Sequence, residues 1–306
     1  MRKLFFELMQ VGMGQLDCLS RGPSPEEWKE LYELSQREAV AGICYRGAVS
    51  LFDYGLRAPQ DLIIDWMAEA EEIREHSEHT LSLLAAFQRQ VAKESMRTSV
   101  LSGDGLLSSY GEELFYLRES TAIDVYFKGY RNVAESNKQP ELDVNLMDSV
   151  GVGKSFWRNS RMEKWLQKNG DMLFRQAGEL MVPSPTMHAV LYMAYLYNRL
   201  LSHNLSMRDL MDYFFILRAG GGRYEAFYDA KQTVGDVFSL LSLSRFARGM
   251  MWVMQEVFGL KRECLPVEPL KEEGRFLLDD VLLDNHFLLH WGHLLAHYSW
   301  YDLIKS

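Results

Sequence analysis

The stretch of sequence that decides the fold reads VLSGDGL over residues 100–106 and AIDVYF over residues 122–127. Both segments contain β-branched or aromatic residues, and the first one ends at glycines, which is typical of a strand that stops at a tight turn. A third segment, ELDVNL at residues 141–146, alternates polar and apolar residues as a half-buried strand does. Together the three segments predict a small mixed sheet between residues 97 and 150.

The sequence on both sides of this sheet predicts helices. Ser24 and Pro25 form the pattern of a helix N-terminus, with acidic residues directly after them. Apolar residues recur at helical spacing between Gln60 and Met96, and the chain is expected to be helical again from Phe156 onward. We therefore predict an α+β protein that is mostly helical, with the sheet flanked by N-terminal and C-terminal helices.

Changes in composition along the chain divide it into three regions. These are an N-terminal helical region at 1–96, a reduced α/β core at 97–150 and a C-terminal helical domain at 151–306. A three-stranded sheet buries too little apolar area to be stable alone, so we expect the helices to pack against it.

The composition is that of an ordinary folded protein, with 47% hydrophobic and 25% charged residues. A net charge of -9 repels phosphate backbones, so we expect no general nucleic-acid binding. Three widely spaced cysteines form neither a disulfide framework nor a zinc motif. Without a secretory signal or a long apolar run, we expect a cytoplasmic protein with no membrane partner, and the sequence indicates no particular protein partner.

The motif around the first two predicted strands resembles that of an uncharacterised bacterial nucleotidyltransferase family of the Bacteroides type. Members of that family typically read Leu-Lys-Gly, then a short helix ending in Tyr, then Arg-x-x-Gly-Asp-Ile-Asp-Leu. The matching residues here are Gly103, Tyr110, Arg118 and Asp124. The helix at 206–213 is similar to a second family segment. The resemblance spans most of the chain and implies a nucleotidyltransferase-like core.

The resemblance also implies a binding site for a nucleoside triphosphate with Mg²⁺. Nucleotidyl transfer uses two metal ions that bridge the attacking and leaving oxygens, and Mg²⁺ prefers carboxylate ligands. Two Asp residues at i and i+2 on one strand point to the same face and can share those ions.

The chain departs from the family pattern at several of these positions. Asp124 stands where the second Asp belongs, but Ala122 stands at the first, and a methyl group cannot bind Mg²⁺. Thr121 replaces the preceding glycine and Ser102 replaces the lysine. We therefore expect impaired or absent transfer, weak or absent Mg²⁺ binding, and possible retention of nucleotide or small-ligand binding.

The resemblance assigns candidate roles to individual residues. The candidate catalytic residues are Asp124 and Asp143, and the candidate metal ligands are these two residues with Glu141. The candidate nucleotide-binding residues are Ser102, Gly103, Asp104 and Arg118.

Several of these residues also have simpler interpretations. Asp104 is well placed to cap a helix, and Asp124, Asp143 and Glu141 could be polar residues on an exposed part of the sheet. Two other functions therefore stay open. The first is an active Mg²⁺-dependent enzyme with a rearranged carboxylate site that uses Asp104, Asp124 and Asp143. The second is a helical interaction protein that keeps the fold as a scaffold.

Two further patterns lie in the C-terminal half. Arg208 and Asp212 are spaced i, i+4 and could pair on a helix. Four histidines fall near one helical stripe, where they could hold a metal or belong to a packed helix. These residues are His286, His290, His293 and His297.

Overall fold

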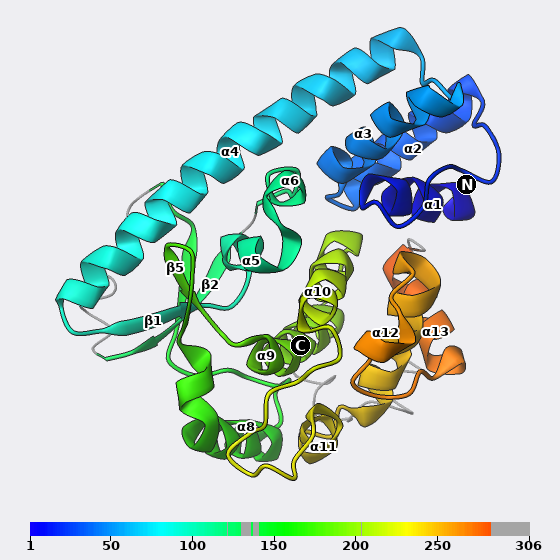
Figure 1. The fold of residues 1–306 in the computed structure, drawn as a ribbon. Helices are drawn as coiled ribbons and strands as arrows, with labels where there is room; N and C mark the ends of the chain where they lie inside the picture. Colours follow the sequence, from blue (N-terminus) through cyan, green and yellow to red (C-terminus); the bar gives the residue numbers. More distant parts are fainter. Residues whose placement is uncertain (121, 130–135, 137–140, 203, 283–306) are drawn as a thin grey trace.

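The structure is a computed structural model that describes residues 1–120, 122–129, 136, 141–202 and 204–282, without the side chains of residues 104, 112 and 280–282. It has the expected α+β class: the described chain is mostly helical and contains a mixed three-stranded sheet and a separate two-stranded sheet (Figure 1). Within these residues, no helix is both long and apolar enough to cross a bilayer.

The N-terminal part folds into helices, and the predicted helix start at Ser24 is confirmed. The Ser24 hydroxyl accepts a hydrogen bond from the backbone N–H of Glu27, and the Glu27 carboxylate accepts one from the N–H of Ser24. Such a reciprocal cap satisfies two otherwise unpaired donors. The helices are α1 (Arg2–Gly12), α2 (Pro25–Arg37), α3 (Ala41–Ser50), a short 3-10 helix (Leu51–Tyr54) and the long α4 (Gln60–Lys93).

The predicted sheet forms in the middle of the chain. Strand β2 (Ile123–Lys128) lies between β1 (Arg97–Val100), to which it is antiparallel, and β3 (Val144–Met147), to which it is parallel. The turn after β1 leads into a 3-10 helix (Gly103–Leu106) and two short helices, α5 (Leu107–Tyr110) and α6 (Glu112–Phe115). The three expected strands are therefore present, each displaced by up to a few residues.

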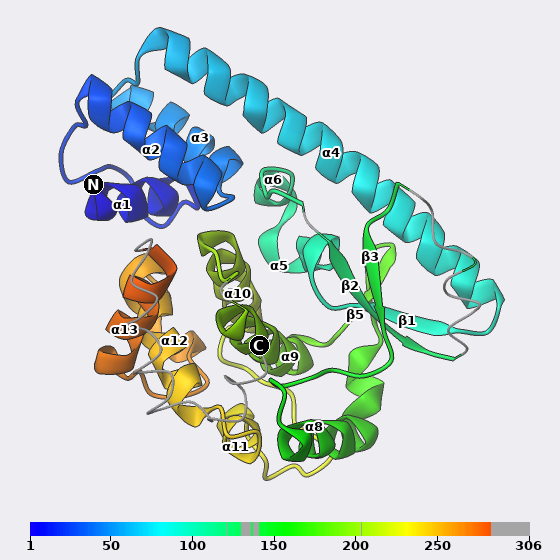
Figure 2. The same ribbon diagram turned by 180° about the vertical axis from the view of Figure 1, so that it is seen from behind.

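Helix α4 covers one face of the sheet, as Figures 1 and 2 show. Its residues Phe87 and Val91 belong to the same buried apolar cluster as Val125 and Phe127 of β2. Because side chains alternate along a strand, Asp124, Tyr126 and Lys128 point to the opposite face of the sheet.

The structure corrects the expectation that the chain from Phe156 onward contains helices without strands. Helix α8 (Phe156–Asn169) and a 3-10 helix (Gly170–Leu173) are followed by a hairpin of β4 (Arg175–Ala177) and β5 (Leu180–Val182). The hairpin turn contains Gly178 at φ 58°, a backbone conformation that suits glycine. Leu180 and Val182 join the cluster beneath α4. Tertiary packing therefore turns this segment into strands.

The C-terminal helices surround a central buried pair. Helices α9 and α10 are largely buried, and Figure 1 shows α12 and α13 close to α1. Between Tyr224 and Gly259 the chain forms two short helices, and Thr233 caps the start of the first one with Asp236. The elements are α9 (Pro185–Leu201), α10 (Met207–Gly220), α11 (Val234–Leu240), α12 (Ser244–Phe258), a 3-10 helix (Arg262–Cys264) and α13 (Lys271–Leu282).

Candidate functional site

The candidate site lies where β1 ends and β2 begins. The backbone N–H of Asp124 donates a hydrogen bond to the Ser102 hydroxyl at 3.1 Å, and the Asp124 carboxylate accepts one from the Asn145 amide at 3.2 Å. Burial raises the pKa of Asp124, although Asn145, Ser102 and the charge of Arg199 act against the rise. The predicted motif residues Ser102 and Asp124 are therefore neighbours in space.

Gly103 makes the turn that brings them together. Its φ of 65° is strained for other residues, and a Cβ atom there would lie 2.9 Å from Cγ1 of Ile123. A Cβ at Gly105 would lie 2.6 Å from Cγ1 of Val100. Close packing explains both glycines. The proposed role of Gly103 in nucleotide binding stays a prediction, and the side chain of Asp104 lies outside the described part.

The structure does not gather the other proposed metal ligands around Asp124. Asp143 is exposed just before β3, and its backbone carbonyl accepts a hydrogen bond from Ile123 at 2.8 Å. Glu141 is also exposed and lies 3.3 Å from the His79 ring of α4. Among the described side chains, no three His, Cys, Asp or Glu residues are grouped as a metal site.

The residue opposite Asp124 in the sheet is an amide. The register pairs Asp124 of β2 with Asn145 of β3. One half-buried carboxylate, one amide and one hydroxyl supply oxygens but a single negative charge, whereas two bridging Mg²⁺ ions need several carboxylates. The described groups that hydrogen-bond to Asp124 therefore add no second carboxylate, and weak or absent Mg²⁺ binding stays a prediction.

Arg118 is buried in an ion pair with a C-terminal helix. It is 2% exposed and forms a two-pronged ion pair with Asp212 of α10, with Nε–Oδ1 and Nη2–Oδ2 distances of 2.7 and 2.8 Å. Tyr110 and Tyr192 also donate their hydroxyls to Asp212, at 2.6 and 2.7 Å. This buried cluster ties the segment before β2 to the C-terminal helices. Nucleotide binding by Arg118 stays a prediction.

The charges of this cluster stabilise each other. Burial alone would raise the pKa of Asp212, but the adjacent Arg118 guanidinium, together with Arg208 and the Tyr110 hydroxyl, outweighs burial and lowers that pKa. The same interaction outweighs the effect of burial on Arg118 and raises its pKa well above the ordinary value. Burial raises the pKa of Tyr110 and Tyr192, so both phenols stay protonated and donate.

The expected pair between Arg208 and Asp212 is wrong. Arg208 donates to Asp209 at 3.0 Å, and Asp212 is already occupied by Arg118. The Nε atom of Arg208 is buried and has no hydrogen-bond partner among the described residues. Arg199 of α9 donates to the other oxygen of Asp209 at 3.2 Å. Arg208 and Arg199 therefore share one carboxylate.

His188 is a further residue that the sequence did not single out. It is 3% exposed on α9, and its Nε2 donates to the carbonyl of Leu101 at 2.8 Å, directly before the Ser102–Gly103 turn. Burial lowers the pKa of His188 to about 4, so the ring is neutral at physiological pH. The four histidines of the C-terminal stripe lie outside the described residues.

Searches against known protein families, curated proteins and solved structures found no match for this chain.

Proposed function

We propose that this chain is a nucleotidyltransferase-like protein that binds a nucleotide or another small ligand beside the Gly103 turn, with nucleotidyl transfer impaired or absent. The observation that carries the proposal is the contact of Asp124 with Ser102 at the end of β1. These two motif residues come from positions 22 apart in the sequence and meet beside a glycine with positive φ.

The chemistry of the site supports binding better than transfer. Ala122 contributes no ligand atom, Asn145 is neutral, and Ser102 cannot supply the charge of a lysine. With a single carboxylate, the site holds Mg²⁺ poorly unless the ligand brings its own phosphate oxygens. The half-buried Asp124 can instead accept a hydrogen bond from a ligand hydroxyl or amine.

Nucleotide titrations test this function. Calorimetry with ATP, GTP, CTP and UTP should show weak binding, well above micromolar Kd, with little change when Mg²⁺ is added. Without bridging metal, the Asp124 carboxylate repels phosphates, whereas the amide oxygen of asparagine can still accept a hydrogen bond from the ligand; Asp124→Asn should therefore strengthen nucleotide binding. Asp17→Asn, at an exposed position between α1 and α2 and outside the proposed site, is the matched control.

The other outcomes of this titration point to the other functions. Tight binding that requires Mg²⁺, weakens in Asp124→Asn and accompanies pyrophosphate release would show an active enzyme with a rearranged site. The absence of binding to every nucleotide would contradict the proposal and favour a scaffold role.

Restoring the missing carboxylate is a second test of the arrangement. Ala122→Asp places a carboxylate two residues before Asp124, which the strand geometry directs to the same face. The two carboxylates repel each other without metal, so the variant should be less stable than the native chain and should gain stability on addition of Mg²⁺. Ser102 is left unchanged because it is 4% exposed and holds the N–H of Asp124. Thermal melts of the native chain and of Ala122→Asp, each with and without Mg²⁺, test this expectation. If Mg²⁺ changes the melting temperature of both proteins by the same amount, the two carboxylates do not share a face as assigned.

A further inference from the structure

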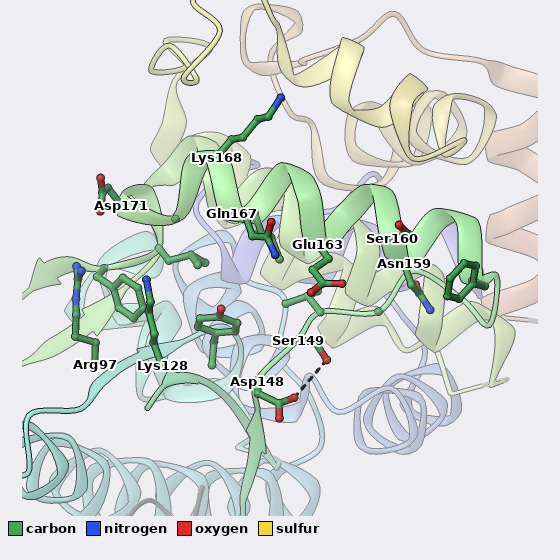
Figure 3. Close-up of a pocket in the computed structure, with 18 residues that line it drawn as sticks. Arg97, Lys128, Asp148, Ser149, Asn159, Ser160, Glu163, Gln167, Lys168 and Asp171 are labelled. Carbon is green, nitrogen blue, oxygen red and sulfur yellow. Dashed lines mark hydrogen bonds between the residues drawn. The ribbon is translucent and has the colours of Figure 1, made fainter. Parts of the chain in front are cut away.

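A cavity of about 600 Å³ lies on the face of the sheet that α4 does not cover (Figure 3). Its walls come from β1 and β2, from the segment after β3, and from α8 with the 3-10 helix that follows it. Lys128 lies four residues beyond Asp124 on the same face of β2, which at ~3.3 Å per residue places it about 13 Å along the strand. Neither Asp124 nor Ser102 lines the cavity, so it is distinct from the candidate site described above.

One end of the cavity carries two positive charges, and the carboxylate of Asp171 lies on the same side of the cavity in Figure 3. Arg97 and Lys128 are directly opposite each other in the register of β1 and β2. Like charges at such a pair of positions destabilise a sheet. Neither side chain forms an ion pair with an acidic residue in the described part of the chain, and the Arg97 guanidinium lies 4.1 Å from the centre of the Phe174 ring. The pair is therefore available to an anion.

The other part of the cavity carries mainly acidic and neutral polar groups; Lys168 of α8 also belongs to the lining but extends away from Glu163 in Figure 3. Figure 3 shows Glu163 of α8 extending toward Ser149 and Asp148, while Asn159 and Gln167 lie on the same helix. Tyr126, on β2, also lines the cavity; its pKa is raised by burial and by the nearby charges of Asp148 and Glu163. Carboxylates and amides at this spacing accept hydrogen bonds from hydroxyl or ammonium groups.

These two ends restrict the chemistry of a ligand. A simple anion would bind at Arg97 and Lys128 but would gain nothing from Glu163 and Asp148. A neutral sugar would leave the cationic pair without a counter-charge. A molecule with a phosphate at one end and hydroxyl or amino groups at the other satisfies both, and Arg and Lys are well suited to phosphate oxygens. The cavity volume lies within the range of small-molecule sites.

We propose that this cavity binds a sugar phosphate, and an amino sugar phosphate most tightly. The phosphate lies between Arg97 and Lys128, and the hydroxyl and amino groups of the sugar donate to Glu163 and Asp148. The aromatic side chains of Tyr126 and Phe174 provide the apolar wall against which a sugar ring packs. This inference does not depend on the proposed nucleotide binding.

Calorimetry on the full chain tests the proposal with four probes: glucosamine 6-phosphate, glucose 6-phosphate, glucosamine and inorganic phosphate. We expect affinity to decrease in the order in which they are named, with the first probe at least about tenfold tighter than inorganic phosphate. The double variant Arg97→Gln with Lys128→Gln should lose about tenfold or more in affinity for both sugar phosphates. Glu163→Gln should weaken the amino sugar phosphate more than glucose 6-phosphate.

The control variant removes two positive charges, as the double variant of Arg97 and Lys128 does, but outside the cavity. Lys164→Gln with Lys231→Gln changes two exposed lysines that do not line the cavity, and should leave all four affinities within about twofold. Circular dichroism verifies that each variant is folded; all the exchanged side chains are exposed. The proposal is overturned if millimolar sugar phosphate gives no binding, if inorganic phosphate binds as tightly as glucosamine 6-phosphate, or if the cavity variants behave like the control.

Discussion

Asp212 is fully buried and accepts hydrogen bonds from Arg118, Tyr110 and Tyr192. Asp212→Asn keeps the size of the side chain but leaves the Arg118 charge buried without a counter-charge. Breaking such a pair on one side costs about 3–5 kcal/mol, and we expect a loss of that order in the free energy of unfolding from urea titrations. Glu268→Gln, in an exposed pair with Arg262, should change it little. A similarly small loss for Asp212→Asn would contradict the role of the cluster.

His188 should make stability depend on pH. Its pKa is about 4 when folded against an ordinary 6.5, so the unfolded chain binds more protons between these values. Stability therefore falls as the pH decreases from 6.5 to 4, by up to about 3 kcal/mol from this residue. His188→Gln, which can still donate to Leu101, should flatten that dependence in urea titrations at several pH values. His79→Gln, at an exposed position, should retain the pH dependence of the free energy of unfolding. If this dependence is the same in the native chain and in both variants, His188 is not its source.

The contacts of the candidate site could be predicted from the sequence only in part. Ser102 and Asp124 belong to a recognisable strand–turn–strand motif, and the structure places them together. The position of Asn145 opposite Asp124 depends on the register of a parallel strand, which no local pattern specifies. The partner of Arg118 is 94 residues away in the sequence. Both halves of that ion pair lie in segments that the motif includes, but their pairing is a property of the tertiary fold.

At the scale of elements, α1 and α3 approach so closely that glycine is required between them. A Cβ atom at Gly47 of α3 would lie 2.5 Å from the carbonyl oxygen of Leu8 in α1. Gly47→Ala should therefore destabilise the protein by about 1–3 kcal/mol, despite the better helix propensity of alanine.

Gly220 of α10 provides the matched control for this substitution. Within the described part of the chain, a Cβ atom there would meet Tyr224 alone, at an ordinary 3.5 Å. Gly220→Ala should be neutral or stabilising by up to about 1 kcal/mol in the same chemical denaturation. If both alanine variants are equally stable, α1 and α3 are not packed as closely as described.

Whether an element could be predicted depended on whether its signals are local. The α2 cap is encoded within four residues, and the structure confirms it. The β4–β5 hairpin could not be predicted because its strands are only three residues long. They are stabilised by packing in the apolar cluster that α4 forms with the sheet. Gln88 of α4 fixes this hairpin by bonding both the N–H and the carbonyl of Met181. Contacts between residues so far apart in the sequence cannot be predicted from the pattern of a short segment.

At the scale of the whole molecule, the apolar cores cross the three regions that the composition suggests. The cluster beneath α4 combines Phe87 from the first region, Val125 from the second and Leu180 from the third. The larger cluster likewise joins α1 to the helices near the C-terminal end of the described chain. The sheet is therefore stabilised by residues that lie before and after it in the sequence.

This shared packing predicts that the chain unfolds as one cooperative unit. Phe87 is 1% exposed, so Phe87→Ala should cost about 3–5 kcal/mol by leaving a cavity against the sheet. If the sheet and the helices are coupled, far-ultraviolet circular dichroism and tryptophan fluorescence should both shift to lower urea by the same amount, each in a single transition. The native chain should show the same coincidence at higher urea. Separate transitions in the variant, with the helical signal retained after the sheet is lost, would mean that the core at 97–150 unfolds independently. Coincident transitions would instead show that the cluster around Phe87 links the candidate site to the helices on both sides of it.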